Sequence, residues 1–195
     1  MKRIIISQRV DLIESYNERR DALDQRWAEF LWEAGCVGIP VFNHAPSLTE
    51  LLESIQADGI LLSGGNSPAS YGGSAPERDD TDEMLISHAL KNNKPLLGVC
   101  RGMQSIVLHY GGTLRKVEGH VAVRHDLDTK RNVNSYHGYA PDLIPGELTV
   151  LAKTADGAVE YIKHKTLPVT GIMWHPERES PFAPEDLELL RELFA

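Results

Sequence analysis

The sequence has little cysteine, no excess of positive charge and no long apolar run. Its 195 residues include two cysteines, Cys36 and Cys100, too few for the disulfide framework of a small secreted domain. Lysine and arginine total 20 against 28 acidic residues, and the resulting charge of −8 argues against a protein that follows nucleic-acid phosphates. The longest apolar runs have about five residues, whereas a membrane-spanning helix needs about 18. We therefore expect no nucleic-acid partner and no membrane partner.

The first residues also lack the features of a secretion signal. Met1-Lys2-Arg3 is followed by only Ile4-Ile5-Ile6, and a signal peptide needs an apolar stretch of at least about seven residues. Hydrophobic residues make up 42% and charged residues 25%, as in ordinary globular proteins. No repeat, low-complexity tract or linker divides residues 1–195. These features predict one cytoplasmic domain that is an enzyme or a binding module.

Short apolar runs alternate with helical patterns in the first half of the chain. We expect strands at 4–6, 37–42, 59–62 and 95–99, and helices at 23–34, 47–55, 81–92 and 102–110, with Ser47 as an N-cap. This alternation predicts an α/β fold with a parallel sheet and helices on both of its faces. After Gly111-Gly112, short strands are expected at 113–117, 121–126, 131–136, 148–153, 158–163 and 169–174, followed by a helix at 184–194. Ala155-Asp156-Gly157 indicates a hairpin between two of these strands.

The segment Gly98-Val99-Cys100-Arg101-Gly102 is the most informative part of the sequence. It follows an apolar strand and precedes a helical pattern, which is the setting of a nucleophile elbow with cysteine in place of serine. Glycines relieve the crowding at such a sharp turn. The turn places the sulfur at a helix N-terminus, where the helix dipole favours the thiolate. Cys100 is therefore the predicted nucleophile, and Cys36 is expected to be a small apolar core residue.

A thiolate nucleophile needs a base that is held by an acid. The strand pattern Gly171-Ile172-Met173-Trp174 leads into His175-Pro176-Glu177. Residues two apart in an extended segment point to the same side, and Pro176 is expected to prevent a helix there. The sequence therefore predicts that His175 and Glu177 face one site as base and orienting acid. The alternative is a surface histidine beside a solvated glutamate.

Acyl transfer also requires hydrogen-bond donors for the developing oxyanion. In an elbow, one donor is the backbone N–H of the residue after the nucleophile, here Arg101. The loop Ser63-Gly64-Gly65-Asn66 follows a neighbouring predicted strand and is placed to supply the second donor. No Gly-Lys-Ser/Thr follows this loop, so it is not a phosphate-binding loop of the P-loop type.

Other polar residues give weaker signals. His120, His125 and His137 lack the spacing of known metal motifs, so no metal site is predicted. Arg9 is expected at the end of the first strand, and Arg19 and Arg20 at the start of the first helix. Together with Arg26, they form either a substrate anchor or a solvated helix face, and the solvated face is the favoured interpretation. Because the carboxyl ends of parallel strands converge, we expect Arg9 to lie close to Cys100.

At Cys100, His175 and Glu177 the chain resembles the class I glutamine amidotransferase superfamily, and the resemblance extends over nearly the whole length. It also rests on the Gly-Gly loop, the elbow with Gln104, the segment Asn134-Ser135-Tyr136-His137 and Trp174-His175-Pro176-Glu177. The resemblance implies a flavodoxin-like α/β sandwich with extra antiparallel strands. It implies a Cys-His-Glu triad, with oxyanion donors at Gly65 and Arg101. It further implies that Gln104, Ser135, Tyr136 and His137 hold the glutamyl group.

Within this superfamily the chain is similar to the stand-alone γ-glutamyl hydrolases, above all to the γ-glutamyl-CDP-amidate hydrolases of capsule phosphoramidate synthesis. The closer similarity rests on Ser7-Gln8-Arg9, Tyr16, Glu18-Arg19, Asp24, Trp27 and 171–179, while Asn66-Ser67 departs from the polyamine-pathway hydrolases. It implies hydrolysis of a small γ-glutamyl amide without a metal or organic cofactor, and Arg9 is a candidate phosphate anchor. The alternative is a glutaminase subunit that delivers ammonia to a separate synthase.

Overall fold

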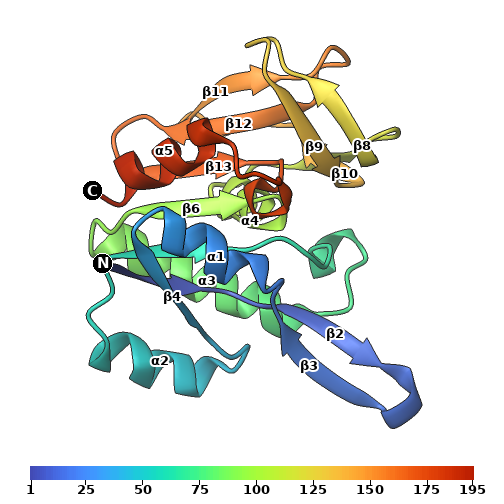
Figure 1. The fold of residues 1–195 in the computed structure, drawn as a ribbon. Helices are drawn as coiled ribbons and strands as arrows, with labels where there is room; N and C mark the ends of the chain where they lie inside the picture. Colours follow the sequence, from blue (N-terminus) through green and yellow to red (C-terminus); the bar gives the residue numbers. More distant parts are fainter.

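A seven-stranded sheet forms the centre of the computed structural model, which describes all 195 residues (Figure 1). The strand order is β11-β12-β13-β6-β5-β1-β4. Five strands are parallel: β1 (Lys2–Ile6), β4 (Cys36–Pro40), β5 (Gly59–Leu62), β6 (Leu96–Val99) and β13 (Val169–Ile172). The strands β11 (Leu148–Lys153) and β12 (Val159–His164) extend the sheet in antiparallel register. The predicted parallel α/β sheet with additional antiparallel strands is confirmed.

Helices cover both faces of this sheet (Figure 1). On one face lie α3 (Pro76–Lys91) and α4 (Arg101–His109), and on the other lie α1 (Arg26–Glu33) and α5 (Pro184–Leu193), whereas α2 (Ala45–Ser54) packs against α3. Because β5, β6 and β13 are buried along their whole length, these strands are short apolar runs without alternation. A single cluster of 38 buried hydrophobic residues joins the strands to the helices. No helix of the chain combines the length and the apolar character required to cross a membrane.

Three two-stranded sheets extend from this core. They are β2 (Arg9–Ile13) with β3 (Glu18–Ala22), β7 (Leu114–Lys116) with β10 (Tyr139–Pro141), and β8 (Val121–Asp126) with β9 (Asn132–Tyr136). The short 3₁₀ turns are η1 (Glu14–Tyr16), η2 (Ala69–Tyr71) and η3 (Pro176–Arg178). In Figure 1, the hairpins β2–β3 and β8–β9 both lie toward the end of the sheet where β6 terminates. They therefore flank the carboxyl ends of the parallel strands.

The β2–β3 hairpin corrects the prediction for the N-terminal arginines. Arg9 begins β2 instead of ending the first strand, and Arg19 and Arg20 lie in β3 instead of starting a helix. The chain reverses after η1, where Asn17 has a φ of 48°. In the resulting register Asp11 lies opposite Arg20, and opposite charges at such a position stabilise a strand pair.

Helix starts also differ from the predicted ones. The helix expected from Ser47 begins at Ala45, and its N-cap is His44, whose ring accepts the Ser47 N–H. The helix expected from Thr81 begins at Pro76, a residue suited to the first helical position because it has no N–H to leave unpaired. Similarly, the first helix begins at Arg26 instead of Leu23. For α3 the physical reason is that the first turn carries polar residues, which add nothing to the apolar periodicity.

Candidate active site

Cys100 lies in the sharp turn between β6 and α4. Its φ of 51° and ψ of −101° are rare for a residue with a side chain, and such strain is typical of functional turns. The flanking glycines make the turn possible: a Cβ on Gly102 would lie 2.2 Å from the Leu62 carbonyl oxygen, and one on Gly98 would lie 2.6 Å from the Gly102 carbonyl oxygen. The strand–turn–helix geometry predicted for this segment is therefore present, with Cys100 as the N-cap of α4.

His175 and Glu177 follow the neighbouring strand β13 and form a buried pair. The His175 Nδ1 atom lies 2.8 Å from Glu177 Oε1, and each residue is only 2% exposed. The prediction of an extended segment was wrong in one respect. Pro176 does not prevent a helix but starts η3, since proline fits the first position of such a turn. The turn, and not strand alternation, brings the carboxylate back to the imidazole.

The surroundings of His175 favour its charged form. Burial lowers the pKa of this imidazole. The charge of the Cys100 thiolate and a hydrogen bond to it raise the pKa, as does the Glu177 carboxylate, and together these effects outweigh burial. The net result is a pKa of about 9 for His175. A thiolate–imidazolium pair at neutral pH is the state required of a cysteine nucleophile and its acid–base partner.

Two residues outside the predicted site hold the loop that carries this pair. Asn134 clamps the backbone of His175: its Oδ1 accepts the His175 N–H at 2.9 Å, and its Nδ2 donates to the His175 carbonyl at 2.8 Å. Arg26 donates to the carbonyl oxygens of Glu177 at 2.8 Å and Glu179 at 2.6 Å. Arg26 therefore belongs neither to a solvated face nor to a substrate anchor. No local sequence signal identifies these roles, because each depends on a contact between distant segments.

The two predicted oxyanion positions border one cavity together with Cys100. This cavity of about 380 Å³ is lined by Cys100, Gly65 and Arg101, among others. Gly65 has a φ of 100°, and a Cβ on Gly64 would lie 2.5 Å from His175 Cε1. The loop can therefore approach the His175 ring closely only because both positions are glycine. The fully buried Arg78 holds the loop by donating to the Ser63 carbonyl at 2.7 Å. It also pairs with Asp82, which contacts the Arg101 guanidinium.

Three of the four residues predicted to hold the glutamyl group border the larger cavity, and Ser135 does not. Gln104 and Tyr136 line the 380 Å³ cavity. The Gln104 side chain donates to the Tyr139 carbonyl, and the Tyr136 ring packs edge-on against His175 with 5.6 Å between ring centroids. In contrast, the fully buried Ser135 hydroxyl donates to the His120 carbonyl and does not line the cavity.

His137 borders the cavity, but its ring is directed elsewhere: its Nε2 lies 3.0 Å from the Glu160 carboxylate. His120 Nδ1 and His125 Nε2 lie 3.7 Å and 3.6 Å from the same carboxylate oxygen. In the sequence, Glu160 lies 23 residues beyond His137. No motif spacing links Glu160 to the three histidines.

A second cavity of about 220 Å³ adjoins the first one. Arg9, Gly65, His175 and Arg178 line both cavities, and Asp24 and Trp27 border only the smaller one. Arg9 therefore lies beside both cavities, near Cys100 as predicted, and its guanidinium is 2.6 Å from the Asp11 carboxylate. The sequence did not single out Arg178 as a site residue. Its guanidinium carbon lies 4.4 Å from the Tyr136 ring centroid.

The remaining N-terminal arginines line neither of these cavities. Arg19 pairs with Glu77, and Arg20 pairs with Glu18. Both ion pairs are partly exposed, so these arginines are surface residues of the hairpin and do not contribute to the site.

Comparisons with known proteins agree with this geometry. The family model "Glutamine amidotransferase class-I" matches residues 20–195. The γ-glutamyl-CDP-amidate hydrolase of Campylobacter jejuni is 29% identical, over 97% of this chain and 96% of that protein. The γ-glutamyl-γ-aminobutyrate hydrolase PuuD of Escherichia coli K12 is also 29% identical, over 81% of this chain and 79% of that protein. The crystal structure of a provisionally assigned GMP synthase subunit from Thermoplasma acidophilum covers 100% of this chain and 92% of its own, with a TM-score of 0.75 and 22% identity, which confirms the flavodoxin-like fold.

Proposed function

Because the chain belongs to the class I glutamine amidotransferase family, we propose that it hydrolyses a γ-glutamyl amide through a thioester on Cys100. The observation that carries the proposal is the buried His175, which interacts with Glu177 on one side and with Cys100 on the other. Relatives that share most of the chain length are γ-glutamyl amide hydrolases, which supports the same reaction class. The protein is then a C–N hydrolase that releases glutamate.

In the first half of the reaction, the Cys100 thiolate attacks the γ-carbonyl carbon of the substrate. Negative charge develops on the carbonyl oxygen, and the backbone N–H groups of Gly65 and Arg101 stabilise it. The His175 imidazolium gives its proton to the leaving nitrogen, the C–N bond breaks and the amine departs. The products of this step are the free amine and a γ-glutamyl thioester.

In the second half, His175 is neutral and accepts a proton from water as the water attacks the thioester carbonyl. The C–S bond breaks, glutamate leaves and the thiolate–imidazolium pair is restored. Glu177 orients the imidazole and stabilises its protonated form in both halves. We assign the glutamyl group to the larger cavity, where Gln104 and Tyr136 supply polar contacts. The proposed chemistry uses these protein groups alone.

The leaving group that we propose carries phosphate, as in a γ-glutamyl nucleotide amidate of capsule phosphoramidate synthesis. Arg9 and Arg178 border both cavities, and guanidinium groups bind phosphate oxygens in pairs of hydrogen bonds. The relative from Campylobacter jejuni, by its name, acts on such a compound. A leaving ammonia would offer these arginines nothing to bind.

The test is a panel of substrates given to the purified chain. Glutamine, γ-glutamyl-γ-aminobutyrate and γ-glutamyl-CDP-amidate are incubated with the wild type and with Cys100→Ala, and released glutamate is measured. We expect turnover by the wild type, with the highest kcat/KM on the CDP-amidate, and none by Cys100→Ala. Turnover of glutamine alone, stimulated by a second protein, would instead favour a glutaminase that supplies ammonia to a synthase.

A further inference from the structure

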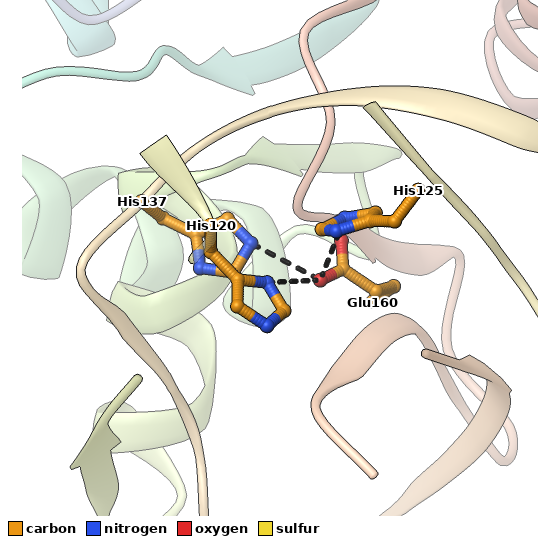
Figure 2. Close-up of side chains that lie close together, drawn as sticks. All are labelled: His120, His125, His137 and Glu160. Carbon is orange, nitrogen blue, oxygen red and sulfur yellow. Dashed lines mark hydrogen bonds and ion pairs between the residues drawn. The ribbon is translucent and has the colours of Figure 1, made fainter. Parts of the chain in front are cut away.

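Three histidines of the β8–β9 hairpin region and one glutamate of β12 meet beside the larger cavity, which His137 also lines. His120 precedes β8, His125 lies in β8, His137 follows β9 and Glu160 lies in β12. Figure 2 shows three dashed lines from the three rings ending on one carboxylate oxygen. Glu160 Oε1 is 3.0 Å from His137 Nε2, 3.6 Å from His125 Nε2 and 3.7 Å from His120 Nδ1. The four ligand atoms all lie within 4.8 Å of one another.

The protein leaves two of these four atoms, and the second oxygen of Glu160, without hydrogen bonds. Only the His137 contact meets hydrogen-bond geometry, while His120 Nδ1, His125 Nε2 and Glu160 Oε2 are buried without a partner. Glu160 is 0% exposed, and histidines are its only ion-pair partners. Buried polar groups in native proteins nearly always have partners. A cluster of buried nitrogen and oxygen atoms without partners therefore points to a ligand.

The contact of His120 with Asp156 shows what kind of ligand these atoms suit. His120 Nε2 lies 2.9 Å from Asp156 Oδ2, and the same carboxylate also accepts hydrogen bonds from the Thr154 hydroxyl and the Ala158 N–H. The acceptor in this contact is a carboxylate oxygen, so the ring N–H of His120 that faces it is on Nε2. Its Nδ1 therefore presents a lone pair to the cluster, beside the lone pairs of the Glu160 carboxylate. Lone pairs that face one another repel, and a cation bound between them removes this repulsion.

We propose that His120, His125, His137 and Glu160 bind one divalent transition-metal ion of the Zn²⁺ type. Four ligands at Zn²⁺ bond lengths of about 2.0–2.2 Å in a tetrahedron lie about 3.3–3.6 Å apart. The three nitrogens lie 3.0–3.7 Å from Glu160 Oε1, and all four atoms lie within 4.8 Å of one another, so small side-chain shifts suffice to close the shell. Three imidazoles with one carboxylate suit Zn²⁺, whereas Mg²⁺ and Ca²⁺ prefer oxygen ligands alone. Asp156 is the outer-shell carboxylate that orients a histidine ligand.

Such a site has a structural role because four protein donors fill a tetrahedral shell and leave no position for substrate. The metal ion joins the β8–β9 hairpin to β12 of the central sheet. It thereby fixes the segment from Asn134 to His137, which clamps His175 and borders the larger cavity. This inference is independent of the reaction proposed for Cys100.

The experiment measures the metal content of untagged protein. The chain is incubated with excess Zn²⁺, dialysed against a weak chelator and analysed by mass spectrometry of the metal. We expect about one Zn²⁺ per chain, and a melting temperature higher by about 5–10 °C at free Zn²⁺ 100-fold above the dissociation constant. With Co²⁺ as the probe, we expect the visible absorption of a four-coordinate ion.

Variants locate the ion. His125→Gln and Glu160→Gln should lose the Zn²⁺, and Asp156→Asn should weaken binding by about 10–100-fold. His88→Gln is the matched control, because the His88 side chain forms no hydrogen bond, and it should retain the full content. Cys100→Ala should retain it as well, which separates this site from a metal on the nucleophile. Wild type without bound Zn²⁺ or Co²⁺, or equal metal content in Glu160→Gln, would overturn the proposal.

Discussion

The two cysteines of the chain lie in different surroundings. Burial raises the pKa of the Cys36 thiol and so disfavours its thiolate. Cys100 lies at the N-terminus of α4, borders a cavity and contacts a histidine with a pKa of about 9. Since the thiolate is the reactive form, iodoacetamide should label Cys100 well before Cys36, as measured by peptide mass spectrometry.

Substituting each cysteine in turn distinguishes the roles of the two thiols. Cys36→Ala should keep both the rapid labelling and the release of glutamate, whereas Cys100→Ala should lose both and still fold. Glutamate release by Cys100→Ala at the wild-type rate would rule out the covalent mechanism.

In the proposed mechanism Glu177 acts only through His175, so its removal should change both the rate and the pH profile. Glu177→Gln keeps the shape of the side chain but removes the charge that supports the imidazolium, and we expect kcat to fall by about 10²–10⁴. The wild-type activity should decline as the pH rises through about 9, where His175 loses the proton that the leaving amine needs. Because Glu177 raises the pKa of His175, this alkaline limb should move to lower pH in the variant.

The measurement for Glu177 is the pH dependence of kcat/KM. Glu185→Gln, an exposed change at the start of α5, serves as the control and should leave the profile unchanged. An unshifted alkaline limb in Glu177→Gln would remove Glu177 from its assigned role.

At the scale of elements, the packing of α4 on the sheet depends on one glycine. A Cβ on Gly102 would lie 2.2 Å from the Leu62 carbonyl oxygen, and backbone atoms cannot move aside as a flexible side chain can. Gly102→Ala should therefore cost about 1–3 kcal/mol of unfolding free energy, and every kcal/mol lowers the melting temperature by about 2–4 °C. Gly146→Ala, where nothing lies within 4 Å of the added Cβ, should melt close to the wild type.

The β2–β3 hairpin brings Arg9 to the edge of both cavities, and this placement predicts a specificity role. Arg9→Ala should raise KM for a phosphate-bearing γ-glutamyl conjugate and leave glutamine turnover nearly unchanged. Arg20→Ala, on the paired strand and away from the cavities, is the matched control. Paired kinetics on the two substrates provide the measurement, and an equal loss on glutamine would mean that Arg9 supports the glutamyl pocket or the fold instead.

At the scale of the whole molecule, hydrolysis and ammonia delivery predict different behaviour of the isolated chain. A hydrolase contains every group it needs, so kcat on its true substrate should fall in the common range of about 1–10³ s⁻¹ without any added protein. A glutaminase that depends on a synthase should be nearly inactive alone. Steady-state assays of the isolated chain decide between them, and a rate far below 1 s⁻¹ on every conjugate would contradict the proposed hydrolase.

The sequence by itself determined the sheet core, the elbow and the identity of the His175–Glu177 pair. These features are encoded locally. Apolar runs specify strands that are buried on both faces, glycines mark a turn that tolerates no Cβ, and residues two positions apart reach one another across a single turn. The β2–β3 hairpin escaped this reasoning because its strands are short, charged and exposed, and so lack an apolar pattern.

The tertiary structure alone decided which distant groups support the site. Asn134 reaches His175 across 41 residues, Arg26 reaches Glu177 across 151, and Glu160 joins three histidines from another sheet. These contacts depend on how the β8–β9 hairpin and helix α1 pack against the rest of the molecule. Side-chain periodicity reports only whether a residue faces the core or the solvent. It does not say which polar group lies opposite, and that is why the buried His-Glu cluster becomes visible only in the folded chain.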